Sequence, residues 1–125
     1  MAATWNPVLV IDDQPDLRTS LADFIRDHGY GVETAANGWE ALQKLRAGLR
    51  PCIIVMDLMM PEMNGFMFRT QQMLDPQLAN IPVVAHSGVR ELSRYAQLLE
   101  ANAYIEKPAE LEYVMSVIRK HCLKS

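Results

Sequence analysis

Residues 8–13 read Val-Leu-Val-Ile-Asp-Asp, a short apolar run that ends in two carboxylates. A continuous β-branched run of this length is typical of a strand that is buried on both faces of a parallel sheet. Pro15 follows at a place suited to the first turn of a helix. Residues 52–57, Cys-Ile-Ile-Val-Met-Asp, repeat the pattern and end in Asp57. The two stretches therefore predict buried strands that deliver acidic side chains at their carboxyl ends.

Strand-like and helix-like patterns alternate along the rest of the chain. Strands are predicted over residues 8–11, 31–35, 52–56, 81–86 and 103–105. Apolar residues at helical spacing follow each strand, least regularly over residues 66–74 and most clearly in the stripe Leu111, Val114, Met115, Ile118 and Cys122. Such alternation argues for an α/β fold, in which a parallel sheet is covered by helices on both faces.

Length and charge narrow the functional classes. The 125 residues fit one domain. The net charge of −3, from 12 basic and 15 acidic residues, gives no electrostatic case for a nucleic-acid partner. No apolar run approaches the roughly 20 residues of a membrane span, and residues 1–7 lack the regions of a signal peptide. We therefore expect a cytoplasmic protein that binds no nucleic acid and does not insert into membranes.

The chain holds two cysteines, Cys52 and Cys122. A single pair of this kind does not suggest a disulfide framework of the sort that holds small secreted domains together. Thiols also stay reduced in the cytoplasm, which is the expected compartment. We therefore expect a fold that does not depend on disulfide bonds.

Five polar side chains stand at the carboxyl ends of the predicted strands. They are Asp12 and Asp13 after the first strand, Asp57 after the third, Ser87 after the fourth and Lys107 after the fifth. Singly, each has a plainer explanation as a helix cap, a turn residue or a solvated charge. As a set they converge on one edge of a parallel sheet, where such sheets bind ligands.

The chemistry of this set is that of phosphoryl transfer. Three carboxylates in one place repel each other, and Mg²⁺ removes the repulsion because it takes carboxylate, water and phosphate oxygens as ligands. Lys107 supplies a point charge for a phosphate oxygen and Ser87 a hydroxyl donor. A carboxylate is then available as the nucleophile. His86 precedes Ser87, but neighbours in a strand point to opposite faces, so we expect it to pack away from the site.

The segments VLVIDD at residues 8–13 and MDLMMPEMNG at residues 56–65, with Ser87 and Lys107-Pro108, resemble the receiver domain of two-component response regulators. The match is to the single-domain, CheY-like form of that family. It implies one receiver domain over residues 1–125, with a core of about 7–123. It also implies a doubly wound, five-stranded parallel sheet of flavodoxin-like order 2-1-3-4-5.

The resemblance assigns metal and acceptor roles to the acidic residues. Asp57 matches the phosphoacceptor. Asp12 and Asp13 match the acidic pair that holds Mg²⁺, for which Mn²⁺ is a possible substitute. Met59 matches the position whose backbone carbonyl is a further metal ligand.

The resemblance also assigns roles to the remaining polar residues. Ser87 and Lys107 match the hydroxyl and the lysine that contact the phosphoryl group. Lys107-Pro108 matches a peptide bond that is usually cis in the family. Tyr104 matches the aromatic residue that acts with Ser87 as a switch on phosphorylation.

Four positions distinguish this chain within the family pattern. Gly88 stands where alanine is common, and Glu100 where glycine is common, and neither change touches the chemistry. Met59 and Val89 match the positions that flank the path of the attacking water. Both side chains are apolar and cannot orient a water molecule, so we expect slow self-dephosphorylation.

The implied function is that of a phosphoacceptor with self-dephosphorylation and not of a turnover enzyme. Its partners would be a sensor histidine kinase or a histidine phosphotransfer protein, and a downstream protein. The downstream protein would bind the face formed by the fourth helix, the fifth strand and the fifth helix. The chain would alternatively be the receiver fragment of a larger regulator with a DNA-binding or enzymatic output.

Three rival classes fit the sequence less well. A flavodoxin-like phosphate-ligand binding module needs a Gly-rich or hydroxyl-rich loop after the first strand, where this chain has Asp-Asp-Gln-Pro. An aspartate-nucleophile phosphatase resembles DxDxT after the first strand, whereas Asp57 follows the third. A pure interaction module would not require five reactive residues at one edge.

Overall fold

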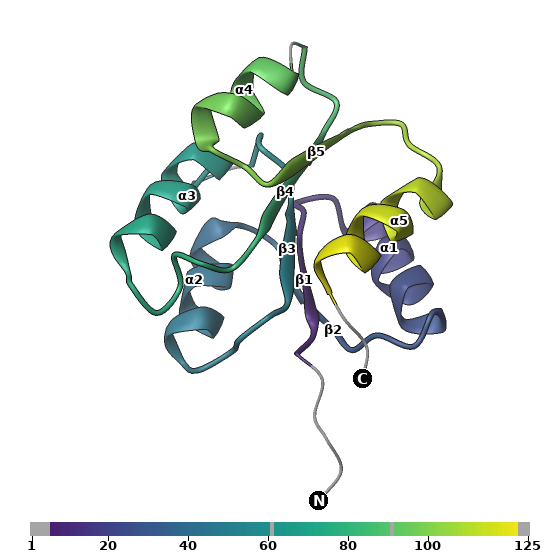
Figure 1. The fold of residues 1–125 in the computed structure, drawn as a ribbon, viewed down its shortest axis with the longest axis horizontal. Helices are drawn as coiled ribbons and strands as arrows, with labels where there is room; N and C mark the ends of the chain where they lie inside the picture. Colours follow the sequence, from purple (N-terminus) through teal and green to yellow (C-terminus); the bar gives the residue numbers. More distant parts are fainter. Residues whose placement is uncertain (1–5, 61, 91, 123–125) are drawn as a thin grey trace, which may run out of the picture.

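The computed structural model describes residues 6–60, 62–90 and 92–122. Strands and helices alternate along the chain (Figure 1). The strands are β1 (Val8–Ile11), β2 (Val32–Ala35), β3 (Ile53–Met56), β4 (Val83–Ser87) and β5 (Ala103–Glu106). The helices are α1 (Pro15–Asp27), α2 (Gly38–Arg46), α3 (Gly65–Leu74), α4 (Leu92–Leu99) and α5 (Leu111–His121). Within the described residues, none of these helices has the length and apolar character that a membrane span requires.

The five strands form one parallel sheet in the order β2-β1-β3-β4-β5. The predicted α/β fold and its strand order are therefore confirmed. In the central pair, Ile11 lies opposite Met56, so the residues that follow these two strands leave the sheet side by side. The register alone thus brings the acidic ends of β1 and β3 together.

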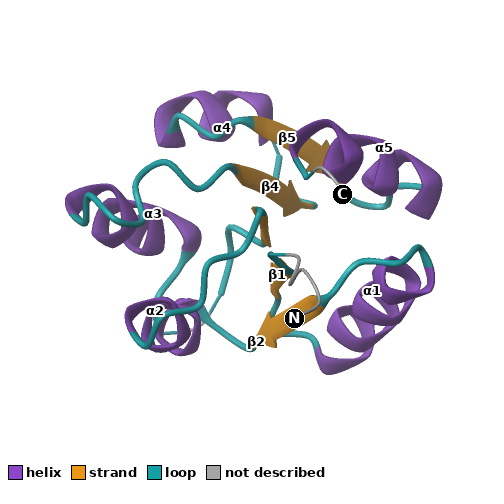
Figure 2. Cartoon of the chain, turned by 60° about the horizontal axis from the view of Figure 1, so that its bottom comes forward, coloured by secondary structure: helices purple, strands orange, loops and turns teal. Residues whose placement is uncertain are grey.

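Helices cover both faces of the sheet, with α1 and α5 on one side and α2, α3 and α4 on the other (Figures 1 and 2). Side chains alternate between two apolar cores, because successive strand residues point to opposite faces. Leu9 and Ile11 of β1 pack with the α2, α3 and α4 side, whereas Val8 and Val10 pack with the α1 and α5 side. This two-sided burial explains why the strands read as continuous apolar runs.

Strand β4 begins later than the sequence pattern predicts. Pro82 has no N–H to donate to a neighbouring strand, although its carbonyl accepts a hydrogen bond from the Ile54 N–H at 2.9 Å. The first donor of β4 is therefore Val83, whose N–H bonds to Oδ1 of Asn102 at 2.9 Å. At the other end the strand extends through Ser87.

Helix α3 has an irregular apolar period because two polar side chains lie on its buried face. Gln72 is fully buried and Arg69 is 7% exposed. The Arg69 guanidinium donates to Oε1 of Gln72 at 2.8 Å and to the carbonyls of Leu99 and Glu100 at 3.1 and 2.7 Å. Burial lowers the pKa of Arg69, and the nearby charge of Glu100 only partly offsets this effect. The arginine thus ties α3 to the end of α4 through hydrogen bonds that replace apolar contacts.

Glu100 departs from the family pattern at a position that has a structural cost. Its φ angle is 57°, in the left-handed region that glycine adopts most easily. The Arg69 bond to its carbonyl holds the backbone in this conformation.

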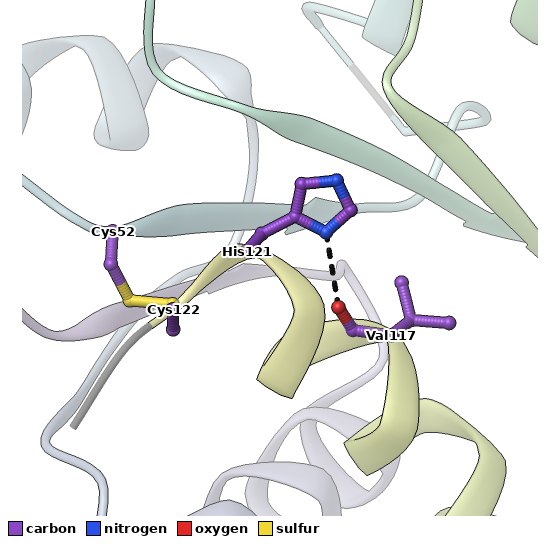
Figure 3. The surroundings of a disulfide bond; sticks show 4 residues. All are labelled: Cys52, Val117, His121 and Cys122. Atoms are coloured by element: carbon purple, nitrogen blue, oxygen red, sulfur yellow. Dashed lines mark hydrogen bonds between the residues drawn. A yellow bond between two sulfur atoms is a disulfide. The ribbon is translucent and has the colours of Figure 1, made fainter.

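Cys52 and Cys122 form a disulfide bond (Figure 3). The expectation of a fold without disulfides is therefore wrong for this pair. Cys52 directly precedes β3, and Cys122 directly follows α5, so both lie at the edge of the sheet where the strands begin. Their Cα atoms are 5.3 Å apart although 70 residues separate them in sequence. A parallel crossover fold creates this proximity, which residue spacing alone does not predict.

Candidate functional site

Backbone hydrogen bonds place the site residues at the carboxyl edge of the sheet. The N–H of Asp12 donates to the carbonyl of Ala35 at 3.1 Å, and the N–H of Asp57 donates to that of Ile11 at 3.0 Å. The N–H of Lys107 donates to the carbonyl of Ser87 at 3.0 Å. These bonds continue the sheet ladder by one residue, so the side chains start from rigid positions.

Three carboxylates gather at this edge, as the sequence predicts. One oxygen from each of Asp12, Asp13 and Asp57 lies within 4.8 Å of the other two. Asp12 is only 4% exposed, Asp57 is half-buried and Asp13 is exposed. The cluster therefore runs from the interior of the sheet edge to solvent.

The Lys107 ammonium bridges the two inner carboxylates. Its Nζ lies 2.8 Å from Oδ2 of Asp12 and 3.0 Å from Oδ2 of Asp57. Burial disfavours the charged ammonium, but the hydrogen bonds to both aspartates outweigh this and raise the pKa of Lys107. The Lys107–Pro108 peptide bond is cis, in agreement with the resemblance.

Main-chain N–H groups orient the carboxylates through their other oxygens. Oδ1 of Asp12 accepts from the Gln14 N–H at 2.9 Å, and Oδ1 of Asp57 accepts from the Met59 N–H at 3.1 Å. Arg18 donates to the backbone carbonyl of Asp12 at 2.8 Å. The loops after β1 and β3 therefore hold both aspartates in place.

An open hollow of about 370 Å³ lies over Asp57; we call it the acidic hollow. Its lining includes Asp13, Asp57, Met59, Ser87, Val89 and Lys107. Ser87 is 2% exposed, and its Oγ accepts a long hydrogen bond of 3.4 Å from the Val89 N–H. The hydroxyl thus lies at the wall of the hollow as the acceptor of a long, weak hydrogen bond.

Tyr104 lies apart from the acidic hollow. Its side chain is 43% exposed, on β5. It lines a different hollow, with Glu106, Pro108 and Tyr113. Tyr104 therefore belongs to the outer surface of β5 and α5 in this structure.

His86 does not line the acidic hollow, but the cavity that it does line is shared with Asp12 and Lys107 of the site, so His86 is less separated from the site than predicted. It lines a cavity of about 340 Å³ between α1 and α5, which we call the α1–α5 cavity, with Leu17, Leu111 and Lys107 among its walls. Burial, followed by the charge of Lys107, lowers the pKa of His86 to about 4. The sequence pattern placed Leu111 in an apolar stripe, but it is 42% exposed, and Leu17 of α1, which lines the same cavity, is 48% exposed.

The donor set suits a hard divalent cation. In the described part of the chain, three carboxylates face the ammonium of Lys107, so two negative charges are left uncompensated. The carboxylates and the Met59 carbonyl supply oxygen ligands, which Mg²⁺ prefers. The arrangement therefore combines a cation-binding cluster, a nucleophilic carboxylate, a hydroxyl and an ammonium around one hollow.

Comparisons with known proteins agree with this chemistry. The family model described as response regulator receiver domain matches residues 8–119. The chain is 33% identical to chemotaxis protein CheY of Thermotoga maritima over 117 residues, which cover 90% of this chain and 94% of the relative. It is 35% identical to an uncharacterised 14.6 kDa protein of Leptolyngbya boryana over 118 residues, covering 93% and 89%.

A solved structure of Vibrio cholerae chemotaxis protein CheY4 has the same fold, with a TM-score of 0.85 at 28% identity. The similarity covers 94% of this chain and 99% of that chain. Against two curated response regulators of Synechocystis, the chain spans about half of the relative, 47% and 49%.

Proposed function

The chain belongs to the response regulator receiver domain family of two-component systems, and on that premise we propose that Asp57 is its phosphoacceptor. Members of this family are signalling phosphoacceptors that bind Mg²⁺ in an acidic pocket and interact with histidine kinases and downstream targets. We propose that this chain receives its phosphoryl group from a sensor histidine kinase or a histidine phosphotransfer protein. The observation that carries the proposal is the contact of Lys107 with both Asp12 and Asp57 at the edge of an open hollow.

The chemical step is a displacement at phosphorus. A carboxylate oxygen of Asp57 forms the new P–O bond while the P–N bond to the donor imidazole breaks, and the imidazole keeps the bonding electron pair. Asp12, Asp13, Asp57 and the Met59 carbonyl are the residues that would hold Mg²⁺ or Mn²⁺, which when bound neutralises charge on the transferred group.

Lys107 and Ser87 act on the transferred phosphoryl group. The Lys107 ammonium already lies 3.0 Å from Asp57, so it is placed to pair with an oxygen of a group attached there. The Ser87 Oγ accepts from the Val89 N–H at 3.4 Å, a contact that leaves the hydroxyl proton free to be donated to a phosphoryl oxygen. Self-hydrolysis of the acyl phosphate resets the domain, and we propose no turnover of a separate substrate.

We propose Ser87 and Tyr104 as the switch that couples the phosphoryl group to the surface. Ser87 lines the acidic hollow and Tyr104 is exposed on the neighbouring strand, where the register pairs Ser87 with Glu106. Movement of the hydroxyl toward the phosphoryl group would open space for the Tyr104 ring. The face made by α4, β5 and α5 would then change shape for a downstream protein.

We further propose that residues 1–125 form a single receiver domain, with a core of about 7–123, in the cytoplasm. It would act without direct nucleic-acid contact or membrane insertion. A second possibility is that the chain is the receiver part of a larger regulator. This is favoured by the two relatives of which the chain spans about half.

The experiment that tests the proposal uses the full chain, MgCl₂ and acetyl phosphate as donor, with intact-mass detection of the phosphoryl group. We expect Mg²⁺-dependent labelling of the native protein and none of Asp57→Asn. Asp27→Asn is the matched control, because Asp27 is exposed at the opposite end of α1. Labelling that persists in Asp57→Asn would overturn the assignment.

A further inference from the structure

The disulfide between Cys52 and Cys122 lies at the opposite end of β3 from Asp57. Cys122 directly follows α5, and its N–H bonds to the Ile118 carbonyl at 2.8 Å. Cys52 precedes β3, and its N–H bonds to the Pro7 carbonyl at 2.9 Å. The bond therefore ties the last turn of α5 to the edge of the sheet where the strands begin (Figures 1 and 3).

We propose that Cys52–Cys122 is a redox modification site, which a dithiol reductant opens and an oxidant closes, and which controls the attachment of α5 to the sheet. The inference rests on the proposed cytoplasmic location and on the proposed output face that includes α5. In a reducing compartment a disulfide is usually transient and redox-sensing, and it is rarely a permanent brace.

The exchange begins at the sulfur of the more exposed residue, Cys52. Cys122 is 2% exposed, whereas Cys52 has intermediate exposure. A thiolate of the dithiol attacks Sγ of Cys52 and forms a mixed disulfide, while Sγ of Cys122 leaves with the bonding electrons and takes up a proton. The second thiol of the reductant then displaces the Cys52 thiolate. The dithiol loses two electrons and becomes a disulfide, and the protein gains two thiols.

Opening the bond would loosen the end of α5 and leave the acidic hollow unchanged. Val117 and Ile118 pack into the core, but His121 points away from the disulfide, and its Nδ1 bonds within the helix to the Val117 carbonyl at 3.0 Å (Figure 3). Among the described residues, the disulfide is therefore the covalent anchor of this turn. Asp57 lies at the opposite edge of the same sheet.

The first test equilibrates the folded native chain with mixtures of oxidised and reduced dithiothreitol, followed by acid quench, maleimide labelling and intact-mass analysis. We expect one transition between unlabelled and doubly labelled protein. Two free thiols at the most oxidising ratio, or a bond that resists reduction until the chain is unfolded, would each overturn the proposal.

Single variants test which sulfur is attacked. In the folded state, the lone Cys52 thiol of Cys122→Ser should react with maleimide roughly tenfold faster than the lone Cys122 thiol of Cys52→Ser. Equal rates, or a faster Cys122, would contradict attack at Cys52.

Hydrogen exchange and thermal unfolding test the consequence for α5. Reduction should speed amide exchange over residues 117–122 and leave β1 unchanged, and should lower Tm on the order of 10 °C. The Cys52→Ser/Cys122→Ser double variant is the control, because its exchange and Tm should not respond to dithiothreitol. Equal exchange of oxidised and reduced native protein would refute the anchoring role.

Phosphorylation separates this proposal from the proposed function. With acetyl phosphate and MgCl₂, we expect equal labelling of Asp57 in the oxidised and reduced chain. If Asp57 takes up no phosphoryl group in either state, the proposed function fails, while the exchange and thiol measurements still decide the redox site. If reduction abolished labelling, α5 and the acidic hollow would not be independent and the inference would be wrong.

Discussion

The ammonium of Lys107 lies 3.0 Å from a carboxylate oxygen of Asp57, and the same ammonium lies 2.8 Å from Asp12. One lysine from the end of β5 thus compensates carboxylates from two other strands. Since Asp13 adds a third negative charge, this bridge reduces the repulsion between the carboxylates in the absence of a cation. The lysine that is proposed to pair with the phosphoryl group therefore also stabilises the folded protein by pairing with two carboxylates.

We predict that Lys107→Met destabilises the protein in the absence of divalent cations and makes its stability depend on Mg²⁺. The buried Asp12 carboxylate loses its partner, which costs about 1–3 kcal/mol of unfolding free energy. MgCl₂ should restore more stability to the variant than to the native protein. Urea unfolding with and without MgCl₂ measures both the loss of unfolding free energy and its recovery when Mg²⁺ is added.

The control for this variant is Lys120→Met, which removes an exposed ammonium from α5. It should unfold like the native chain under both conditions. A Lys107→Met protein whose stability matched the native value without Mg²⁺ would show that the bridge contributes nothing.

We predict an acid-side loss of stability that depends on His86. Its pKa is lowered from 6.5 to about 4, so the unfolded chain binds a proton at a pH where the folded chain does not. The contribution of the buried, neutral His86 to the free energy of unfolding is fully present above pH 6.5. It is lost as the pH drops from 6.5 toward 4. Because the side chain is partly exposed, the loss is at most about 3 kcal/mol.

The measurement is urea unfolding at a series of pH values from neutral to acidic, for the native chain and for His86→Leu. The carboxylates contribute to the acid response of both proteins, so the informative quantity is the difference between the two curves. That difference should change over this window, and a constant difference would refute the assignment.

We predict that Arg69→Met costs roughly 3 kcal/mol, because it leaves Gln72 and the carbonyls of Leu99 and Glu100 without their donor. Arg69→Lys should recover only part of this, since one ammonium does not span three acceptors. Thermal unfolding compares both with Arg46→Met, which loses one exposed bond to Gln71. Similar losses for positions 69 and 46 would rule out a special role for the buried guanidinium.

The site residues at the carboxyl ends of the strands could be predicted from the sequence. Each apolar run marks a strand, and a parallel sheet gathers the residues that follow the runs, so Asp12, Asp57, Ser87 and Lys107 meet without further information. The family resemblance adds the strand order, which alternation of strands and helices alone does not specify.

Features that depend on contacts between distant helices could not be predicted in this way. Arg69 is read as a break in the apolar period of α3, because its acceptors are backbone carbonyls at the end of α4. The partnership of Cys52 with Cys122 depends on where α5 ends relative to β3. The α1–α5 cavity that His86 lines depends on how two helices far apart in the sequence lie beside each other, with Leu17 and Leu111 both among its lining residues.

We predict that the phosphoryl group on Asp57 is long-lived because Met59 and Val89, the two positions expected to flank the path of the attacking water, carry apolar side chains. Met59 and Val89 both line the hollow. Because their side chains are apolar, neither orients an attacking water through a hydrogen bond. Met59→Asn places an amide at this position and should shorten the half-life several-fold. The decay of phosphorylated protein after removal of acetyl phosphate, followed by intact mass, measures it.

Met67→Asn is the matched control for this variant, because Met67 is also exposed but lies on α3, and its N–H is held by Asn64. Its phosphoryl half-life should equal that of the native chain, since its side chain does not line the acidic hollow. A native half-life of only seconds would contradict the prediction, because hydrolysis would then proceed without an orienting side chain at position 59. An unchanged half-life in Met59→Asn would show that access of water, and not its orientation, limits the reaction.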